Sequence, residues 1–429
     1  MNSMRSFNRT IKYLLVFLVC SLLLSGCKTG MKPSVENALS AFFVREEKQE
    51  TTVEVKTGED IIVVEKVEEI DLIEENTTAE LSGTDFAKAQ EEIIANGNMY
   101  YAYSQLNEDE QLVYTQILGI LDSFSTDVKV SSLDTDIIDK AFNCVLIDHP
   151  ELFYISGYSY TKFVRGEKLE KITVSGTYTM SESEARKALD RVESYSDECI
   201  AGYTKGGDDY QKVKYVFEYL IKNNEYDLTA PNNQNVLSVV DEHRTVCQGY
   251  AKMTQYILNK MGVFCTLCEG VVKGSEPHVW NVVRVNGDYY HVDTTWGDAS
   301  YNLIQDSETP LDVPDINYDY LCLTDDMIKE THVINSTTDL PECNSMNANY
   351  YVEEGLYFTE LNTDQVKEVF ENALLYGEKS VTIKCASPNV YAAMYAHLIE
   401  DQNVFNYLNG STNINYVEFK DECRISFYL

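Results

Sequence analysis

Amphipathic stripes and alternating apolar runs divide the central part of the chain into helices and strands. Between Val213 and Ile221, apolar residues recur at the three- and four-residue spacing of a helix that buries one face. A second helix is predicted from Cys247 to Gly262, because glycine readily adopts the left-handed conformation that ends a helix. We predict strands for the three runs that follow: 263–273, 279–285 and 289–295. This order indicates an α+β domain, which we place at 205–335.

Two smaller α+β units flank this domain. In the first, at 85–204, Asn107 and Ser181 each stand three residues before a glutamate, the spacing of a capping box at a helix start. Two strands, 152–164 and 168–180, are predicted between these helices. The second unit, 345–429, is predicted to contain strands at 350–359, 381–385, 413–420 and 423–428, with helices starting near Asn362 and at Ser387-Pro388. The second unit shows no ligand motif, so packing, wall-binding or partner-binding roles stay open for it.

The first 26 residues resemble a targeting signal. Basic residues precede a short apolar run, Tyr13 to Leu24, which is too short to span a bilayer well. The segment Leu24-Ser25-Gly26-Cys27 resembles the lipobox of bacterial lipoproteins, in which cleavage precedes a cysteine that then carries lipid. We therefore expect residues 1–26 to be a lipoprotein signal peptide and Cys27 to anchor the protein in the cell membrane, facing outside the cytoplasm. An ordinary signal peptide with a chance cysteine is the alternative.

Residues 27–84 are predicted to form an acidic, flexible stalk. Between Val44 and Gly83, 13 acidic residues stand against 4 basic ones, and aromatic residues are few. The run 60–64 has strand character, so pairing of this piece with a sheet stays open. The whole chain carries a net charge of −35, which makes nucleic acid an unsuitable partner and favours basic ones.

The cysteines are expected to be mostly free thiols. Eleven are present, and eight remain after Cys20, Cys27 and Cys247 are set aside. An even number permits disulfides outside the cytoplasm, but several of the eight lie in apolar runs, where a thiol behaves as a small core residue. Cys265 and Cys268 form a CxxC in a predicted strand, which points its two sulfurs to opposite sides. With no second CxxC and no EF-hand-like loop, we expect no metal and no cofactor.

Cys247 stands where a loop is predicted to become a helix. Helix N-termini carry partial positive charge and unpaired N–H groups, and both favour a thiolate. The backbone N–H of Cys247 would also be free to donate to an oxyanion. A cysteine nucleophile needs an imidazole to take its proton and an acceptor to orient that imidazole. His278 and Asp293, farther along the chain, supply both residue types.

A hairpin is expected to bring His278 and Asp293 together. Asn286-Gly287 between alternating runs is a strong signal for a type I′ turn, so that cross-strand partners have numbers that sum to 573. Asp293 then lies opposite Trp280 and one diagonal step from His278, within reach of a side-chain hydrogen bond. Two other histidines compete as the base: His291 shares the parity of Asp293, and His243 lies four residues before Cys247.

Three segments resemble the transglutaminase-like superfamily, which shares a papain-type Cys-His-Asp arrangement. Family members often read G-V-C-x-G-Y-A, then H-A-W-N, then W-Y-x-V-D-x-T-W. This chain has TVCQGYA at 245–251, HVWN at 278–281 and YYHVDTTW at 289–296. The departures include Thr245 in place of a common glycine and Val279 in place of alanine. The resemblance implies a papain-like α+β core in which the nucleophile starts a helix packed on an antiparallel sheet.

The resemblance also implies roles for individual residues. Cys247 becomes the nucleophile, His278 the general base and acid, and Asp293 the residue that orients it, while His291 becomes structural. The family often has an upstream aromatic or polar side chain in the oxyanion hole, for which Tyr226 and Gln248 are candidates.

The expected function is that of a surface-anchored cysteine hydrolase or acyl transferase. It would act on amide bonds of peptides or proteins, including those of the cell envelope, through an acyl-thioester. Protease-like hydrolysis is favoured slightly over transfer to an amine. The alternatives are a protein cross-linking transglutaminase and a non-catalytic envelope binding or scaffold module on the same fold.

Overall fold

The computed structural model describes residues 52–56, 61–69, 80–204, 206–272, 276–298 and 316–429. The predicted signal peptide, Cys27 and most of the predicted stalk lie outside these residues. Among the described residues, no helix combines the length and the apolar character needed to cross a bilayer. The nine described cysteines are free thiols, and Cys247 alone among them is not buried.

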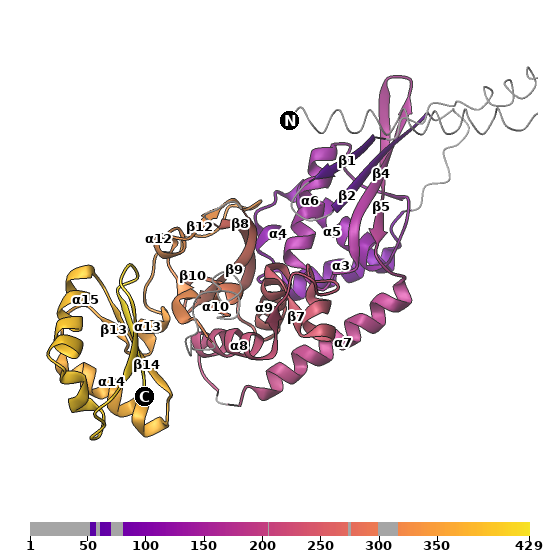
Figure 1. Cartoon of the computed structure of the whole chain (residues 1–429). Coiled ribbons are helices and arrows are strands. Elements are labelled where there is room, and N and C mark those ends of the chain that lie inside the picture. Colours follow the sequence, from indigo (N-terminus) through magenta and orange to yellow (C-terminus); the bar gives the residue numbers. More distant parts are fainter. Residues whose placement is uncertain (1–51, 57–60, 70–79, 205, 273–275, 299–315) are drawn as a thin grey trace, which may run out of the picture. The chain divides into compact units, whose positions relative to one another are not determined.

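The N-terminal unit is a five-stranded sheet with helices beside it (Figure 1). Both predicted capping boxes are present, at Asn107 before α5 and at Ser181 before α7. The sheet has the order β1-β2-β4-β5-β3, with β1 (Thr52–Lys56), β2 (Ile61–Glu69), β3 (Val128–Lys129), β4 (Ile155–Arg165) and β5 (Lys168–Tyr178). The helices are α3 (Gly83–Asn96), α4 (Tyr101–Ser104), α5 (Glu108–Asp122), α6 (Thr135–Asp148) and α7 (Glu182–Gly202).

Part of the predicted stalk belongs to this sheet. Strand β2 pairs in parallel with β4 from Ile62↔Gly157 onward, and the side chain of Val63 is buried. For residues 61–69 the expectation of a solvated spacer is therefore corrected to a strand. The β-branched residues Ile62 to Val64 favour a strand here, and Val63 supplies a buried side chain, in spite of the acidic residues around them.

The central domain places an antiparallel sheet against helix α9 (Cys247–Lys260). The sheet has the order β11-β10-β9-β8-β12, with β8 (Cys265–Val272), β9 (Pro277–Val285), β10 (Asp288–Val292), β11 (Leu321–Leu323) and β12 (His332–Ile334). The other elements are α8 (Asp209–Asn223), β6 (Glu225–Tyr226), η1 (Ser238–Glu242), β7 (Arg244–Thr245), α10 (Thr294–Gly297), η2 (Tyr318–Tyr320) and α12 (Asp325–Ile328). One cluster of buried apolar residues runs through the N-terminal unit and this domain.

The β9–β10 hairpin has the predicted register. Its pairs run from Asp288↔Val285 to Val292↔Asn281, and the numbers of each pair sum to 573. Asn286 and Gly287 both have positive φ, 52° and 97°, as a type I′ turn requires. The sequence pattern extended the strand to residue 295, but β10 ends at Val292.

The C-terminal unit has its own apolar core and a four-stranded sheet. The predicted strand 350–359 is wrong in its first half, because Asn349 caps a helical turn, α13, and Gly355 at φ 70° ends it. The predicted helix starts at Asn362 and Ser387 are present as N-caps, and Gly377 ends the helix that begins after Asn362. The elements are α13 (Tyr350–Glu353), β13 (Tyr357–Phe358), α14 (Thr363–Tyr376), β14 (Ser380–Cys385), α15 (Pro388–Tyr395), η3 (Ala396–Glu400), η4 (Asn403–Tyr407), β15 (Asn415–Phe419) and β16 (Arg424–Tyr428), with sheet order β13-β14-β16-β15.

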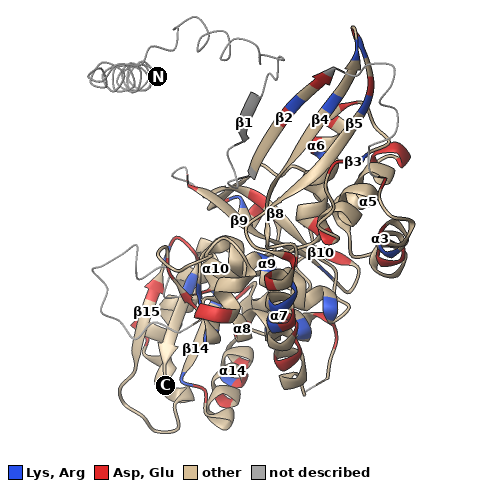
Figure 2. Cartoon of the chain, turned by 90° about the vertical axis from the view of Figure 1, so that its right-hand side faces the viewer, with Lys and Arg blue, Asp and Glu red and all other residues tan. Residues whose placement is uncertain are grey.

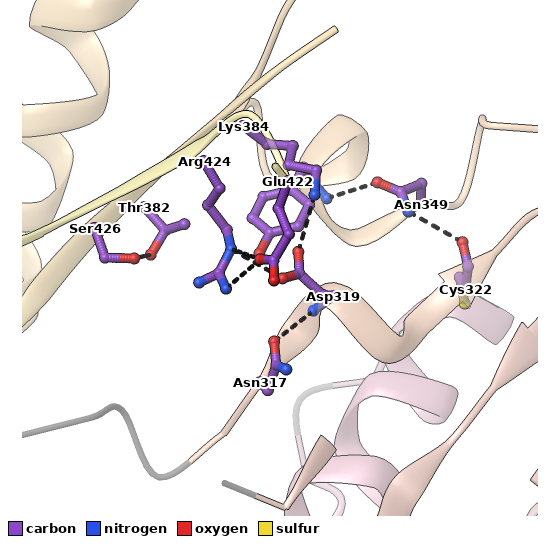
Figure 3. Close-up of polar contacts among 10 residues, drawn as sticks. Asn317, Asp319, Cys322, Asn349, Thr382, Lys384, Glu422, Arg424 and Ser426 are labelled. Carbon is purple, nitrogen blue, oxygen red and sulfur yellow. Dashed lines mark hydrogen bonds and ion pairs between the residues drawn. The ribbon is translucent and has the colours of Figure 1, made fainter. Parts of the chain in front are cut away.

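An ion-pair network joins the C-terminal unit to η2 (Figure 3). Arg424 Nε lies 2.9 Å from Asp319 Oδ2, and Lys384 Nζ lies 3.4 Å from Asp319 Oδ1. Burial alone would raise the pKa of Asp319, but the charges of Arg424 and Lys384 outweigh burial and lower it. In the view of Figure 2, Lys and Arg positions are interspersed with Asp and Glu positions along the described helices and strands.

Candidate active site

Cys247 is the first residue of α9 and is only partly buried. Val246, the N-cap residue, makes no capping hydrogen bond with its side chain. The first N–H groups of α9 are therefore left without a side-chain cap beside the thiol, as an oxyanion site requires.

The turn before Cys247 is tightly packed. Position 249 has room only for glycine, because a Cβ there would lie 1.9 Å from Thr245 Oγ1. The Thr245 hydroxyl accepts from Ser238 Oγ at 2.6 Å, which ties the turn before Cys247 to η1.

Two short parallel strands place the oxyanion candidates near this turn. Tyr226 in β6 pairs with Thr245 in β7, two residues before Cys247. Gln248 follows Cys247 in α9 and is buried, and its Oε1 has no hydrogen-bond partner among the residues that the structure describes. Tyr226 is thus paired with a residue two positions before Cys247, and Gln248 directly follows Cys247. Both remain candidates for the oxyanion hole.

His278 lies between a carboxylate and the thiol. Its Nε2 is 2.7 Å from Asp293 Oδ2, and the ring also faces the Cys247 side chain, whose hydrogen bond and charge contribute to the raised pKa of His278. Burial disfavours a charged ring, but the charge of Asp293 and the hydrogen bonds to Asp293 and Cys247 outweigh it and raise the pKa of His278 to about 10. The imidazole is therefore protonated at neutral pH, with positive charge facing the sulfur.

Asp293 is fully buried and has a donor for each acceptor position. It is the N-cap of α10, where Oδ1 accepts from the N–H groups of Thr295 at 3.0 Å and Trp296 at 3.1 Å. This cap explains why β10 stops before residue 293. Burial would raise the pKa of Asp293, but the charge of His278 and the hydrogen bonds from His278 and His332 hold it well below its usual range.

Hydrogen bonds between the three motif segments fix their relative positions. Asn281, at the end of the second segment, donates from Nδ2 to the carbonyl of Ala251 in α9 at 3.0 Å. Tyr250 in α9 donates to Asp298, just beyond the third segment, at 2.7 Å. The segments therefore serve as a packing unit as well as a source of reactive groups, because the same residues lock helix α9 to β9 and α10.

His291 is occupied by other partners on both ring nitrogens. Trp280 Nε1 donates to His291 Nδ1 at 3.0 Å, and His291 Nε2 lies 2.9 Å from Asp325 Oδ1. An indole N–H can only donate, so the His291 proton resides on Nε2. Burial lowers the pKa of His291, which favours this neutral form. His291 thus has no ring nitrogen left for Cys247, and His278 is the histidine that the structure places beside the thiol.

His332 contacts the site and was missed by the sequence reasoning. Its Nε2 lies 3.1 Å from Asp293 Oδ2, although 39 residues separate the two in the chain. Strand β12, which starts at His332, reaches the site by pairing with β8 at the edge of the sheet. No spacing rule links β12 to β8 from sequence alone. The available signal was a histidine at the head of the apolar run His332 to Ile334.

Two side-chain groups in the described residues have the spacing of metal ligands: His278, Asp293 and His332, and His291, Asp325 and Cys343. In the first, the carboxylate oxygen accepts from both imidazoles. In the second, Trp280 donates to His291 Nδ1, so His291 Nε2 carries the proton and donates it to Asp325. Hydrogen bonds account for both groups, so we assign neither to a metal.

A cleft of about 1450 Å³ opens beside Trp296. The Trp296 ring packs edge-on against His278, with ring centroids 6.5 Å apart. Tyr318, Tyr320 and Tyr350 line the cleft, together with residues of the C-terminal unit. Small-molecule pockets usually measure about 300–1,000 Å³, so this cleft has room for a polypeptide segment.

Comparison with known proteins supports the fold of the central domain. Residues 195–294 match the transglutaminase-like superfamily, so the chain carries a domain of this superfamily, and the expected α+β transglutaminase-like core is confirmed. Kyphoscoliosis peptidase from Homo sapiens is 25% identical over 112 residues, which cover 22% of this chain and 17% of that protein. The chain thus matches about a sixth of its curated relative.

Solved structures overlap with the chain only in part. A crystal structure of a TGase has a TM-score of 0.24 and 12% identity, covering 32% of this chain and 50% of that chain. A candidate cysteine protease from Cytophaga hutchinsonii has a TM-score of 0.23 and 13% identity, covering 30% and 54%.

Proposed function

We propose that this chain is a cysteine hydrolase that cleaves amide bonds in peptides or proteins through Cys247, His278 and Asp293. One observation carries the proposal: His278 is bound to a buried carboxylate on one side and to the thiol of an uncapped helix N-terminus on the other. A scaffold has no use for this arrangement, because it keeps an imidazolium buried beside a partly exposed thiol.

The proposed reaction has two halves. The Cys247 thiolate attacks the carbonyl carbon, and the oxyanion is held by the N–H of Cys247 with Tyr226 or Gln248 as the second donor. The His278 imidazolium gives its proton to the amine as the C–N bond breaks, which leaves an acyl-thioester. His278 then takes a proton from water, the hydroxide attacks the thioester, and the carboxylic acid product leaves as the sulfur is released as thiolate. Asp293 holds the ring in place throughout.

Water is proposed as the acceptor in preference to an amine. The curated relative is named a peptidase, and the same acyl-thioester would give cross-linking if a lysine amine entered instead. We further propose that the lipobox at Leu24 to Cys27 anchors the enzyme at the outer side of the cell membrane, where proteins of the envelope are within its reach.

Incubation with a mixture of unlabelled peptides, followed by mass spectrometry, tests the proposal. Hydrolysis gives two fragments whose masses sum to the peptide plus one water, and adding a primary amine such as putrescine reveals transfer as an amide adduct. We expect fragments with wild-type protein and none with Cys247→Ala. Adducts that replace the fragments would assign cross-linking, and intact peptides in every sample would favour a binding module.

A further inference from the structure

His332 shares the catalytic carboxylate with His278. The side chain is fully buried, and its Nε2 lies 3.1 Å from the same Asp293 Oδ2 that His278 contacts at 2.7 Å. On its other side, His332 Nδ1 is 2.8 Å from Thr331 Oγ1. Both ring nitrogens of His332 therefore have partners, and the partner on the inner side is the carboxylate of the triad.

The four acceptor positions of Asp293 show what this contact does. A carboxylate offers about four lone-pair sites. Two backbone N–H groups fill those of Oδ1, and the two imidazoles fill those of Oδ2. The backbone contacts fix Oδ1. Among the described residues, His332 is the only hydrogen-bond partner of Oδ2 besides His278. Without His332, a buried oxygen would have an unfilled site and more freedom to turn away from His278.

The ring of His332 is itself held in place. Its centroid lies 5.0 Å from that of Trp280, 5.0 Å from Trp296 and 5.2 Å from His278. Backbone pairing of His332 with Val272 fixes the strand that carries it. Aromatic packing on its flanks and a hydroxyl behind it leave His332 one orientation, with Nε2 toward the carboxylate.

We propose that His332 is a positioning residue, which donates from Nε2 to Asp293 Oδ2 and so keeps that oxygen aligned with His278. The inference rests on the proposed function, because alignment matters only if His278 serves Cys247. The titratable groups that face His278 are Cys247, Asp293 and His332. Loss of His332 should weaken the support that Asp293 gives to the imidazolium.

Two variants of similar length separate donation from packing. His332→Gln retains an N–H near the position of Nε2, whereas His332→Met fills the space without a donor. Titration of ¹³C-labelled histidine rings by NMR gives the pKa of His278, and iodoacetamide with mass spectrometry gives the alkylation rate of Cys247 at pH 7. His149→Met is the matched control, because His149 is another buried histidine bound to a carboxylate, with Nδ1 2.7 Å from Glu151 Oε1.

His332→Met should lower the pKa of His278 by about one unit and slow Cys247 alkylation by up to about tenfold, since one pKa unit corresponds to a tenfold change in the pairing equilibrium. His332→Gln should restore most of the His278 pKa and of the Cys247 alkylation rate, and His149→Met should change neither quantity. If His332→Met does not fold, Thr331→Val removes the hydroxyl behind the ring and should give a smaller shift in the same direction.

Two outcomes would overturn the inference, and they differ in what else they remove. If Cys247 is alkylated no faster in the wild type than in His278→Ala, the proposed function and the role of His332 fail together. If the wild type shows activation by His278 but the folded His332→Met, or Thr331→Val in its place, titrates and reacts as wild type, the role of His332 alone is wrong.

Discussion

His278 Nε2 lies 2.7 Å from Asp293 Oδ2, and one two-residue turn accounts for the contact. Asn286 and Gly287 set the register of β9 and β10, which brings the start of one strand level with the end of the other. The carboxylate then caps α10 and is fixed by two backbone N–H groups. The base and its orienting residue are therefore products of local hairpin geometry.

Replacement of Asp293 by asparagine should lower turnover by about 10²–10⁴-fold while the fold is retained, because asparagine still caps α10 but does not stabilise an imidazolium. The pH dependence should change in a defined direction. In the wild type His278 stays protonated up to a pKa of about 10, so activity should fall only at alkaline pH. In Asp293→Asn the alkaline limb should move toward the ordinary histidine pKa of about 6.5. A pH–rate profile with an unmoved limb would contradict the pairing.

The same pKa shifts predict the pH range in which wild type is more stable than Asp293→Asn. Asp293 has a lowered pKa when folded, so its contribution is present above a pH of about 4 and is lost in acid. His278 has a raised pKa when folded, so its contribution is complete below a pH of about 6.5 and is lost as pH rises toward 10. Thermal unfolding of wild type and Asp293→Asn should therefore differ most between these limits.

Gly249→Ala should destabilise the turn that presents Cys247. The new methyl carbon would lie 1.9 Å from Thr245 Oγ1, and overpacking of this kind costs about 1–3 kcal/mol. Thr245→Gly removes the clashing atom, so the double variant should unfold at a higher denaturant concentration than Gly249→Ala alone. Additive losses in a double-mutant cycle would show that the two residues are not in contact as described.

Elements that depend on neighbouring residues could be predicted from the sequence. The hairpin register and the caps at Asn107 and Asn362 follow from neighbouring residues, and each is present. Prediction failed where a distant partner decides the outcome. Strand β2 forms because β4 offers an edge almost a hundred residues later, and β12 carries His332 to the site through pairing with β8. At residue 350 the cap at Asn349 starts a helical turn, which takes the place of the first half of the expected strand.

Arg424→Met should destabilise the joint between η2 and the C-terminal sheet by up to about 3 kcal/mol, because it leaves Asp319 as a largely buried charge with Lys384, a more distant partner. The double variant Asp319→Asn with Arg424→Met removes the uncompensated charge and should recover part of that loss. Guanidinium unfolding of the three proteins measures both values. Equal unfolding of wild type and Arg424→Met would show that the network contributes nothing.

Lipid anchoring through Cys27 predicts a simple fractionation result. Wild-type protein expressed with its own N-terminus in a bacterial host should be cleaved before Cys27 and recovered with membranes. Cys27→Ala should give an uncleaved or a released form, because the acceptor sulfur for the lipid is missing. Processing and membrane recovery that match the wild type would leave the lipobox without a role.

Activation of the Cys247 thiol by His278 is tested most directly by alkylation at pH 7. Isotope-coded iodoacetamide, read out by peptide mass spectrometry, gives the rate at Cys247 in wild type, His278→Ala and His291→Ala. Removal of the His278 ring uncovers the thiol, so slower alkylation of His278→Ala would report the loss of the imidazole and not a loss of access. We predict that His278→Ala slows alkylation of Cys247 at least about tenfold, and that folded His291→Ala, which lacks only a contact to Trp280 and Asp325, reacts like the wild type. Equal rates in wild type and His278→Ala, or a loss confined to His291→Ala, would contradict the account.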